Sequence, residues 1–205
     1  MNTIQTFFLS YPAESRYLIL ALGIFLAGLA ITPVPSDIVF AGIGVLVAHG
    51  IFNYVAAAII CTVFIFLAES LIVEVAHRMG PKLLESPLIA RVLKPERVHA
   101  VRSKLKRSQI KIIRSIRFTV PWRPYLILSL AALGMDRRKF YRIHAINTVA
   151  YVPALIGGIA LISRSFELKE WQILVMIGVL WILSVFLPSK AVGDVNPVAR
   201  SSKRN

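Results

Sequence analysis

The chain has 205 residues, of which 57% are hydrophobic and 17% are charged, and its mean hydropathy is +0.70. It nevertheless carries 24 Lys and Arg against 10 Asp and Glu, a formal net charge of +14. The apolar content excludes a disordered chain, and the single cysteine, Cys61, excludes a disulfide scaffold. A nucleic-acid-binding domain would explain the charge but not the apolar content. We therefore expect an all-α integral membrane protein, one membrane domain over residues 1–205, whose charge is kept out of the bilayer.

The apolar stretches are compared in chain order with the roughly 20 residues that a bilayer-spanning helix needs. Residues 1–16 lack a basic start before an apolar run, so they are not a secretory signal and predict an interfacial segment. Residues 17–47 form the longest apolar stretch, which is too long for a single bilayer-spanning helix. Full transmembrane helices are predicted at 55–76, 143–162 and 171–187.

The basic residues predict the orientation of these spans. Between residues 77 and 142 there are 17 Lys and Arg, and the tail at 188–205 is also basic. The positive-inside rule then places the loop at 77–115 and the tail in the cytoplasm. The N-terminus lies outside in this arrangement.

Two segments then cannot be simple spans. Residues 116–135 have basic flanks on the same side, so they must enter and leave the membrane on the cytoplasmic side, with a break at Pro121. Residues 17–47 are interrupted by Pro33 and Pro35, and proline removes a backbone donor and disfavours helix before it. We therefore predict two re-entrant hairpins of opposite orientation, an inverted repeat around a site at mid-depth.

The basic loop contains an amphipathic segment in its middle. Val98, Val101 and Leu105 recur at helical spacing among basic residues. This pattern suits a surface helix on an anionic leaflet. A topology signal with no further role explains the same charges.

Two acids lie within the apolar stretches, where an ionisable side chain costs about 2.5–3.5 kcal/mol on insertion. Asp37 follows the Pro33–Pro35 break, where it or Ser36 would cap the next helix. Asp37 would also face a polar cavity, and the two roles are compatible. Glu69 lies about two turns inside the span from Arg78. It either forms an internal ion pair that fixes helix packing or takes part in proton coupling.

Two arginines lie on either side of Pro121 in the second hairpin. Arg117 and Arg123 are either interfacial arginines that reach the headgroups or a binding site for a lipid phosphate, which guanidinium groups bind in a bidentate manner. If the two hairpins meet at mid-depth, Asp37 and Glu69 neutralise these arginines when the site is empty. An anionic headgroup would compete for them, and protonation of an acid would release them.

Other site chemistry is not indicated by the sequence. No P-loop, dinucleotide-binding glycine motif or nucleophile elbow is present, so an enzyme is not expected. His77 and His144 lie at predicted span edges without ligand partners at metal spacing, so neither a metal site nor a cofactor is expected.

Several short motifs together resemble the DedA family of membrane proteins, also called VTT or SNARE-associated domain proteins. The resemblance covers about residues 20–162. It is carried by four segments, Pro33-Val-Pro35-Ser36-Asp37, Ala68-Glu69 with Ala76-His77-Arg78-Met79-Gly80, Ile116-Arg117-Phe118 with Arg123, and Arg137-Arg138-Lys139-Phe140. The chain departs from the usual pattern in having Pro121 one place late, Glu69 for the usual Asp, and no acid in residues 17–36.

The resemblance implies the two inverted re-entrant hairpins and transbilayer movement of phospholipids. In bacteria it implies return of undecaprenyl phosphate across the cytoplasmic (inner) membrane, with links to the proton-motive force. The expected function is therefore a flippase- or scramblase-like lipid transporter, and the expected partners are anionic lipids and protons.

Two other classes of function stay open at this stage. One is a proton-coupled transporter of a small solute, and the other is a non-transporting scaffold or envelope-maintenance factor. A homo-oligomer is also left open, because nothing in the sequence fixes the number of copies.

Overall fold

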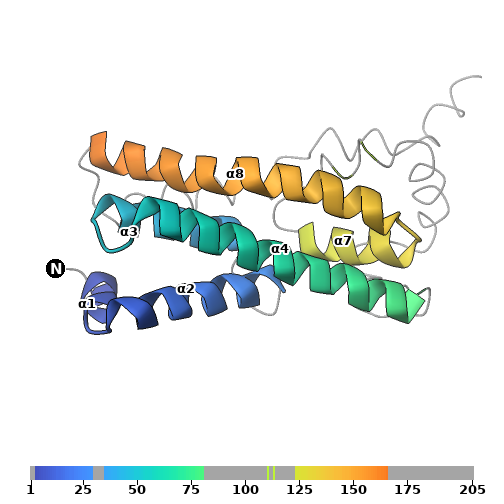
Figure 1. The fold of residues 1–205 in the computed structure, drawn as a ribbon, viewed down its shortest axis with the longest axis horizontal. Coiled ribbons are helices and arrows are strands. Elements are labelled where there is room, and N and C mark those ends of the chain that lie inside the picture. Colours follow the sequence, from blue (N-terminus) through green and yellow to red (C-terminus); the bar gives the residue numbers. More distant parts are fainter. Residues whose placement is uncertain (1–2, 30–34, 81–109, 111–112, 114–122, 166–205) are drawn as a thin grey trace, which may run out of the picture.

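The computed structural model describes residues 3–29, 35–80, 110, 113 and 123–165, which fold into helices packed lengthwise (Figure 1). Their bounds are α1 (Thr3–Leu9), α2 (Ala13–Gly28), α3 (Ser36–Ala48), α4 (Tyr54–Met79), α7 (Arg123–Ala132) and α8 (Arg137–Ser165). No strand occurs in these residues. The prediction of an all-α protein is thus confirmed for the described part of the chain.

Two antiparallel helices, α4 and α8, run the full length of the bundle (Figure 1). They have 26 and 29 residues, so at 1.5 Å per residue they are about 39 Å and about 44 Å long, against a hydrocarbon layer of about 30 Å. Among the described helices, these two are long and apolar enough to cross a membrane. They correspond to the predicted spans at 55–76 and 143–162, while the predicted span at 171–187 lies outside the described residues.

Local capping explains why both long helices extend beyond the predicted bounds. The Asn53 side chain accepts hydrogen bonds from the backbone N–H groups of Val55 and Ala56, which starts α4, and Gly80, with φ +58°, follows its last turn. The Asp136 carboxylate accepts from the backbone N–H of Lys139, which starts α8 six residues before the predicted boundary. This bond and the nearby ammonium lower the pKa of Asp136.

The remaining helices are shorter and cover only parts of this pair. Helix α2 runs from one end of the bundle toward its middle, α3 runs back from the middle, and α7 runs from the middle to the opposite end (Figure 1). Helix α2 starts at Ala13, inside the predicted interfacial segment, and α3 starts directly after Pro35. Of the second predicted hairpin, 116–135, the structure describes α7 and the turn after it.

The apolar core consists of two separate clusters along the bundle. One contains Ile24, Phe40, Cys61 and Ile156 among others, from α2, α3, the first half of α4 and the second half of α8. The other joins the second half of α4, α7 and the start of α8 around Val73, Ile127 and Phe140. In α4 the first cluster ends at Ile65 and the second begins at Ile72, and in α8 they are separated by residues 141–151. The stretch between the two clusters contains buried polar side chains.

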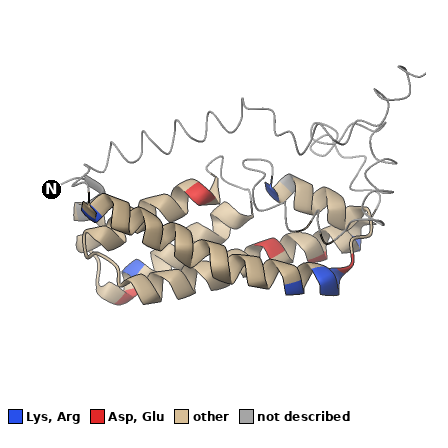
Figure 2. Ribbon diagram, turned by 90° about the horizontal axis from the view of Figure 1, so that it is seen from above, with Lys and Arg blue, Asp and Glu red and all other residues tan. Residues whose placement is uncertain are grey.

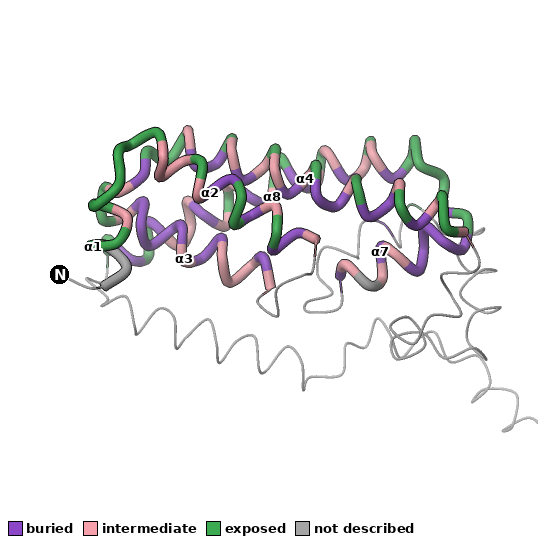
Figure 3. The backbone as a smooth tube through the Cα atoms, turned by 90° about the horizontal axis from the view of Figure 1, so that it is seen from below, coloured by how far each residue is buried: buried purple, intermediate pink, exposed green. Residues whose placement is uncertain are grey.

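The outward side of α4 is a continuous apolar stripe. Its members recur every four residues and are all at least 42% exposed, namely Val55, Ile59, Val63, Leu67, Leu71, Val75 and Met79. Figure 3 shows exposed positions along the outer side of the long helices and buried positions between the helices. An apolar surface of this length is unusual in a soluble monomer and suits contact with lipid chains.

Two glycines, one in α2 and one in α3, allow very close helix contacts. A Cβ atom added to Gly28 of α2 would lie 2.6 Å from the Ala68 Cβ of α4. One added to Gly44 of α3 would lie 2.8 Å from the Ile156 carbonyl oxygen of α8. A backbone oxygen cannot turn aside as a flexible side chain can, so the contact of Gly44 is the less tolerant of the two.

We predict that Gly44→Ala destabilises the protein, because the added methyl group meets backbone of α8. Overpacking of this kind costs about 1–3 kcal/mol. Gly42→Ala is the matched control, since a Cβ at Gly42 meets nothing within 4 Å and alanine favours helix. Thermal unfolding of the purified full chain in detergent measures both. Equal melting temperatures for the two variants would contradict the close α3–α8 contact.

Candidate functional site

Arg123, the first residue of α7, lies buried between the two apolar clusters, with 4% of its surface exposed. Its NH2 nitrogen is 2.8 Å from Glu69 Oε1 and donates a hydrogen bond of 2.6 Å to the Ser36 hydroxyl. Its NH1 nitrogen is 3.6 Å from Asp37 Oδ1. Residues from α3, α4 and α7 therefore converge on one guanidinium group.

The position of Arg123 makes its acidic partners necessary. A helix N-terminus carries partial positive charge, so a cation there is unfavourable on its own. A buried guanidinium also loses its hydration, and burial of an ion is tolerated only with well-placed partners. Glu69 is fully buried and Asp37 is 17% exposed, so both carboxylates lie close enough to the charge to offset these penalties.

Asp37 and Ser36 are placed by the start of α3. Pro35 occupies the N-cap position, and no side chain makes a capping hydrogen bond there. Asp37 therefore does not act as the side-chain cap that the sequence allowed as one alternative. It lies in the first turn of α3, where the helix dipole favours a negative charge.

Glu69 of α4 contacts residues of α7 and α8 within the described part of the chain. Its Oε1 faces Arg123 of α7, and its Oε2 lies 2.8 Å from Nε2 of His144 in α8. The carboxylate therefore bridges two groups from two other helices. The stretch around it is the gap between the apolar clusters, and Figure 2 shows acidic and basic segments here, away from both ends of the bundle.

The sequence analysis did not assign His144 to the site. It expected this residue at a span edge, and the structure shows that its side chain is 5% exposed and lies within α8. Its ring stacks on Phe140 and Phe66, with ring centroids 4.8 Å and 5.4 Å away and interplanar angles of 15° and 16°. The reason is the early start of α8 after Asp136, which puts two helical turns before His144.

A four-residue spacing in α8 could have revealed this position. Buried residues recur along one stripe of the helix, at Phe140, His144, Thr148, Val152, Ile156 and Ala160. His144 and Thr148 are the polar members of that stripe, and they fall level with the gap between the two apolar clusters.

The structure leaves donors of Arg123 without hydrogen bonds. Nε and NH1 of the guanidinium are buried and make no hydrogen bond to the described residues. The NH1–Asp37 separation of 3.6 Å is longer than a hydrogen bond of ordinary strength. Arg123 is thus held firmly through NH2 and retains hydrogen-bonding capacity on its other nitrogens.

Several predicted residues fall outside the described part of the chain. These are Arg117, Pro33 and Pro121, together with the basic loop apart from residues 77–80, 110 and 113, and the tail at 188–205. The structure therefore brings together Asp37, Glu69 and Arg123 of the predicted site. Among the described residues, no group of three or more His, Cys, Asp or Glu is arranged to hold a metal ion.

A second ionic contact lies toward the end of the bundle. Glu74 of α4 is 2.9 Å from the Arg137 NH1 nitrogen and accepts a 2.7 Å hydrogen bond from the Tyr141 hydroxyl, both from the first turns of α8. Arg137 is half exposed and Glu74 is partly exposed. This contact ties α4 to α8 but lies apart from the buried cluster.

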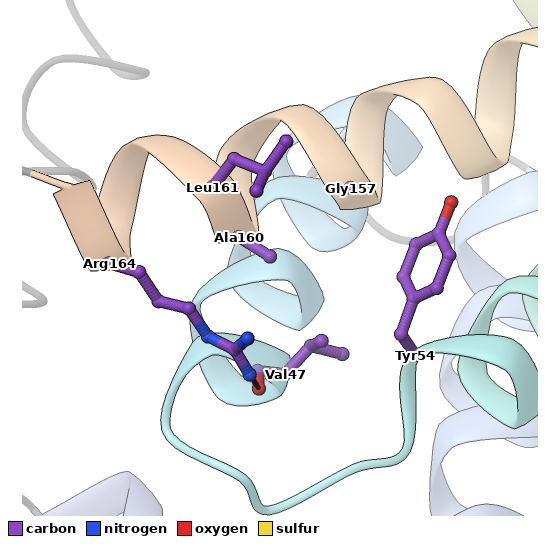
Figure 4. Close-up of a pocket in the computed structure, with 6 residues that line it drawn as sticks. All are labelled: Val47, Tyr54, Gly157, Ala160, Leu161 and Arg164. Atoms are coloured by element: carbon purple, nitrogen blue, oxygen red, sulfur yellow. Dashed lines mark hydrogen bonds between the residues drawn. The ribbon is translucent and has the colours of Figure 1, made fainter.

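A cavity of about 340 Å³ lies at the opposite end, between α3, α4 and α8 (Figure 4). Its walls are mainly apolar, with Tyr54 and Arg164 on facing sides (Figure 4). The Arg164 guanidinium donates to the carbonyl oxygens of Val47 and Ala48, each at 3.3 Å, and so caps the C-terminus of α3.

Comparisons with protein-family models, with curated proteins and with solved structures found no match to this chain. The functional argument therefore depends on the residues and their geometry.

We predict that Arg123→Met destabilises the protein by about 3–5 kcal/mol, because it removes the cation beside the buried Glu69 and the partly buried Asp37. The double variant Arg123→Met with Glu69→Gln should recover part of the loss, since one of those charges is removed. Chemical unfolding of the full chain in detergent measures both. Arg137→Met is the control for loss of an arginine at an exposed ion pair and should change stability little. A double variant less stable than Arg123→Met would argue against the buried pair.

Proposed function

We propose that this protein is a membrane transporter that moves a lipid with an anionic phosphate headgroup, such as undecaprenyl phosphate or a phospholipid, across the bilayer. The observation that carries the proposal is the buried Arg123 between two apolar clusters, held by acids from two other helices. No enzymatic step is proposed.

The chemistry of Arg123 suits a phosphate. A guanidinium group presents several N–H donors in one plane and binds phosphate oxygens in a bidentate manner. Nε and NH1 of Arg123 are buried and make no hydrogen bonds to the described residues, so they are available to such an oxygen pair. A phosphate headgroup that reaches this point would replace a carboxylate as the counterion of Arg123.

The acids explain how the buried charge of Arg123 is tolerated when no lipid is bound. Glu69 and Asp37 neutralise the guanidinium in a setting where an unpaired charge is expensive. A headgroup must compete with them, and protonation of either acid weakens that competition. Proton coupling is therefore an optional part of the proposal, with Asp37 and Glu69 in that role and Arg117 as a second phosphate ligand.

The proposed topology has three full spans and two re-entrant hairpins of opposite orientation. The lengths of the short helices support it. Helices α2, α3 and α7, with 16, 13 and 10 residues, are about 24, 20 and 15 Å long, less than the roughly 30 Å of a hydrocarbon layer. Helices α3 and α7 both start near mid-length of α4, which is where Arg123 meets its partners (Figure 1).

We place the protein in the bacterial inner membrane as a multi-pass protein, on the basis of its resemblance to DedA proteins. A transporter of this kind in that membrane would return carrier lipid or redistribute phospholipid between leaflets.

The proposal is tested with the purified full chain in liposomes that contain a fluorescent phosphatidylglycerol or undecaprenyl phosphate. We expect Arg123→Lys to keep the buried positive charge but to slow transbilayer movement. Loss of one charge-assisted hydrogen bond, about 1.5–3 kcal/mol, corresponds to about a tenfold to hundredfold slower rate. Arg117→Gln should slow it as well.

Arg142→Gln is the matched control, since Arg142 is an exposed arginine of α8 outside the cluster. Wild-type rates in both Arg117→Gln and Arg123→Lys, with normal insertion, would refute the phosphate site. Movement of a small solute without movement of lipid would favour a solute transporter. Movement of neither by the wild-type protein would favour a scaffold.

A further inference from the structure

We propose that His144 is a proton-binding residue of this site, and that its charge state sets how strongly Glu69 holds Arg123. This inference rests on the proposed transport function and adds a residue to it. The proposal starts from the buried contact between His144 Nε2 and Glu69 Oε2, at 2.8 Å.

The geometry makes Glu69 a shared counterion. One oxygen of its carboxylate faces the Arg123 guanidinium and the other faces the His144 imidazole, at equal distances of 2.8 Å. A neutral imidazole is at most a hydrogen-bonding partner of Glu69, whereas an imidazolium is a full counterion. Protonation of His144 therefore divides the negative charge of Glu69 between two cations, and the hold on Arg123 weakens.

The aromatic residues around His144 hold its ring in place and carry no charge that would pair with it. Phe140 and Phe66 stack on its ring, which holds Nε2 2.8 Å from Glu69 Oε2 in a buried position. Such packing positions a histidine for one defined partner. His is also the side chain whose charge changes most readily between about pH 5 and about pH 8.

Other titratable groups on the facing helices are either members of the cluster or engaged elsewhere. Asp37 faces the site from α3, Glu69 from α4 and Arg123 from α7. Further along α4, Glu74 is bound by Arg137 and Tyr141 of α8 itself, close to His77. The direct partner of His144 is therefore Glu69.

The proposal predicts different ion pairs in acid and in alkali. In acid, His144 carries a proton and takes Glu69 as its counterion, and Arg123 is free to bind a phosphate group. In alkali, His144 is neutral, Glu69 returns to Arg123, and the phosphate is displaced. His144 acts through Glu69 and is therefore a positioning residue.

The test compares the wild type, His144→Gln and His77→Gln in liposomes with fluorescent phosphatidylglycerol at several pH values. Gln keeps an N–H donor toward Glu69 but cannot take up a proton. We expect wild-type lipid movement to rise about tenfold as the pH falls from about 8 to about 5.5, equivalent to about 1.4 kcal/mol. His144→Gln should flatten this profile, and His77→Gln, which alters a half-buried histidine outside the cluster, should retain it.

A His144→Gln variant with the wild-type pH profile would overturn the inference, whatever its absolute rate. If the wild-type protein moves no lipid at any pH, the proposed function fails and a second measurement decides about His144. Nitrogen NMR of the imidazole in the purified full chain should then show a change of protonation with pH that Glu69→Gln alters. No such change, or one that is indifferent to Glu69→Gln, would refute the proton site.

Discussion

The burial of one guanidinium group in an otherwise apolar bundle constrains most of the described structure. Arg123 stands at a helix N-terminus, where the backbone dipole opposes a cation, and water does not reach it. Its charge is tolerated there only if acidic side chains of neighbouring helices lie close to it. Glu69 from α4 and Asp37 from α3 fulfil this condition, and their meeting point lies where the two apolar clusters leave a gap. The short helices α3 and α7 and the buried polar residues between the two apolar clusters therefore form one structural unit around Arg123.

The sequence predicted those features that depend on the hydropathy of a single segment. An acid or an arginine inside an apolar run is visible without any structure, which is why Asp37, Glu69 and Arg123 were all singled out. The apolar runs themselves indicated α4 and α8. The break between α2 and α3 followed from Pro33 and Pro35, since proline conflicts with a continuous helix.

Features that depend on contacts between segments were missed. The basic residues 137–142 lower the hydropathy of the first turns of α8, so the predicted span began at Ile143 and His144 was assigned to its edge. The structure continues the helix back to the Asp136 cap, which buries His144 against Glu69. The hydroxyl of Ser36 was likewise unpredictable as a partner of Arg123, because only the approach of α3 to α7 brings them together.

The close contacts of Gly28 and Gly44 have a mechanical consequence for this site. A Cβ atom at Gly28 would meet side chains of α4, and one at Gly44 would meet both the backbone and a side chain of α8. A larger residue at either point would push α2 away from α4 or α3 away from α8. Ser36 and Asp37 stand at the start of α3 and contact Arg123, so a displaced α3 would carry them away from the guanidinium. The absence of a side chain at Gly44 therefore helps to set the distance between Arg123 and its partners on α3.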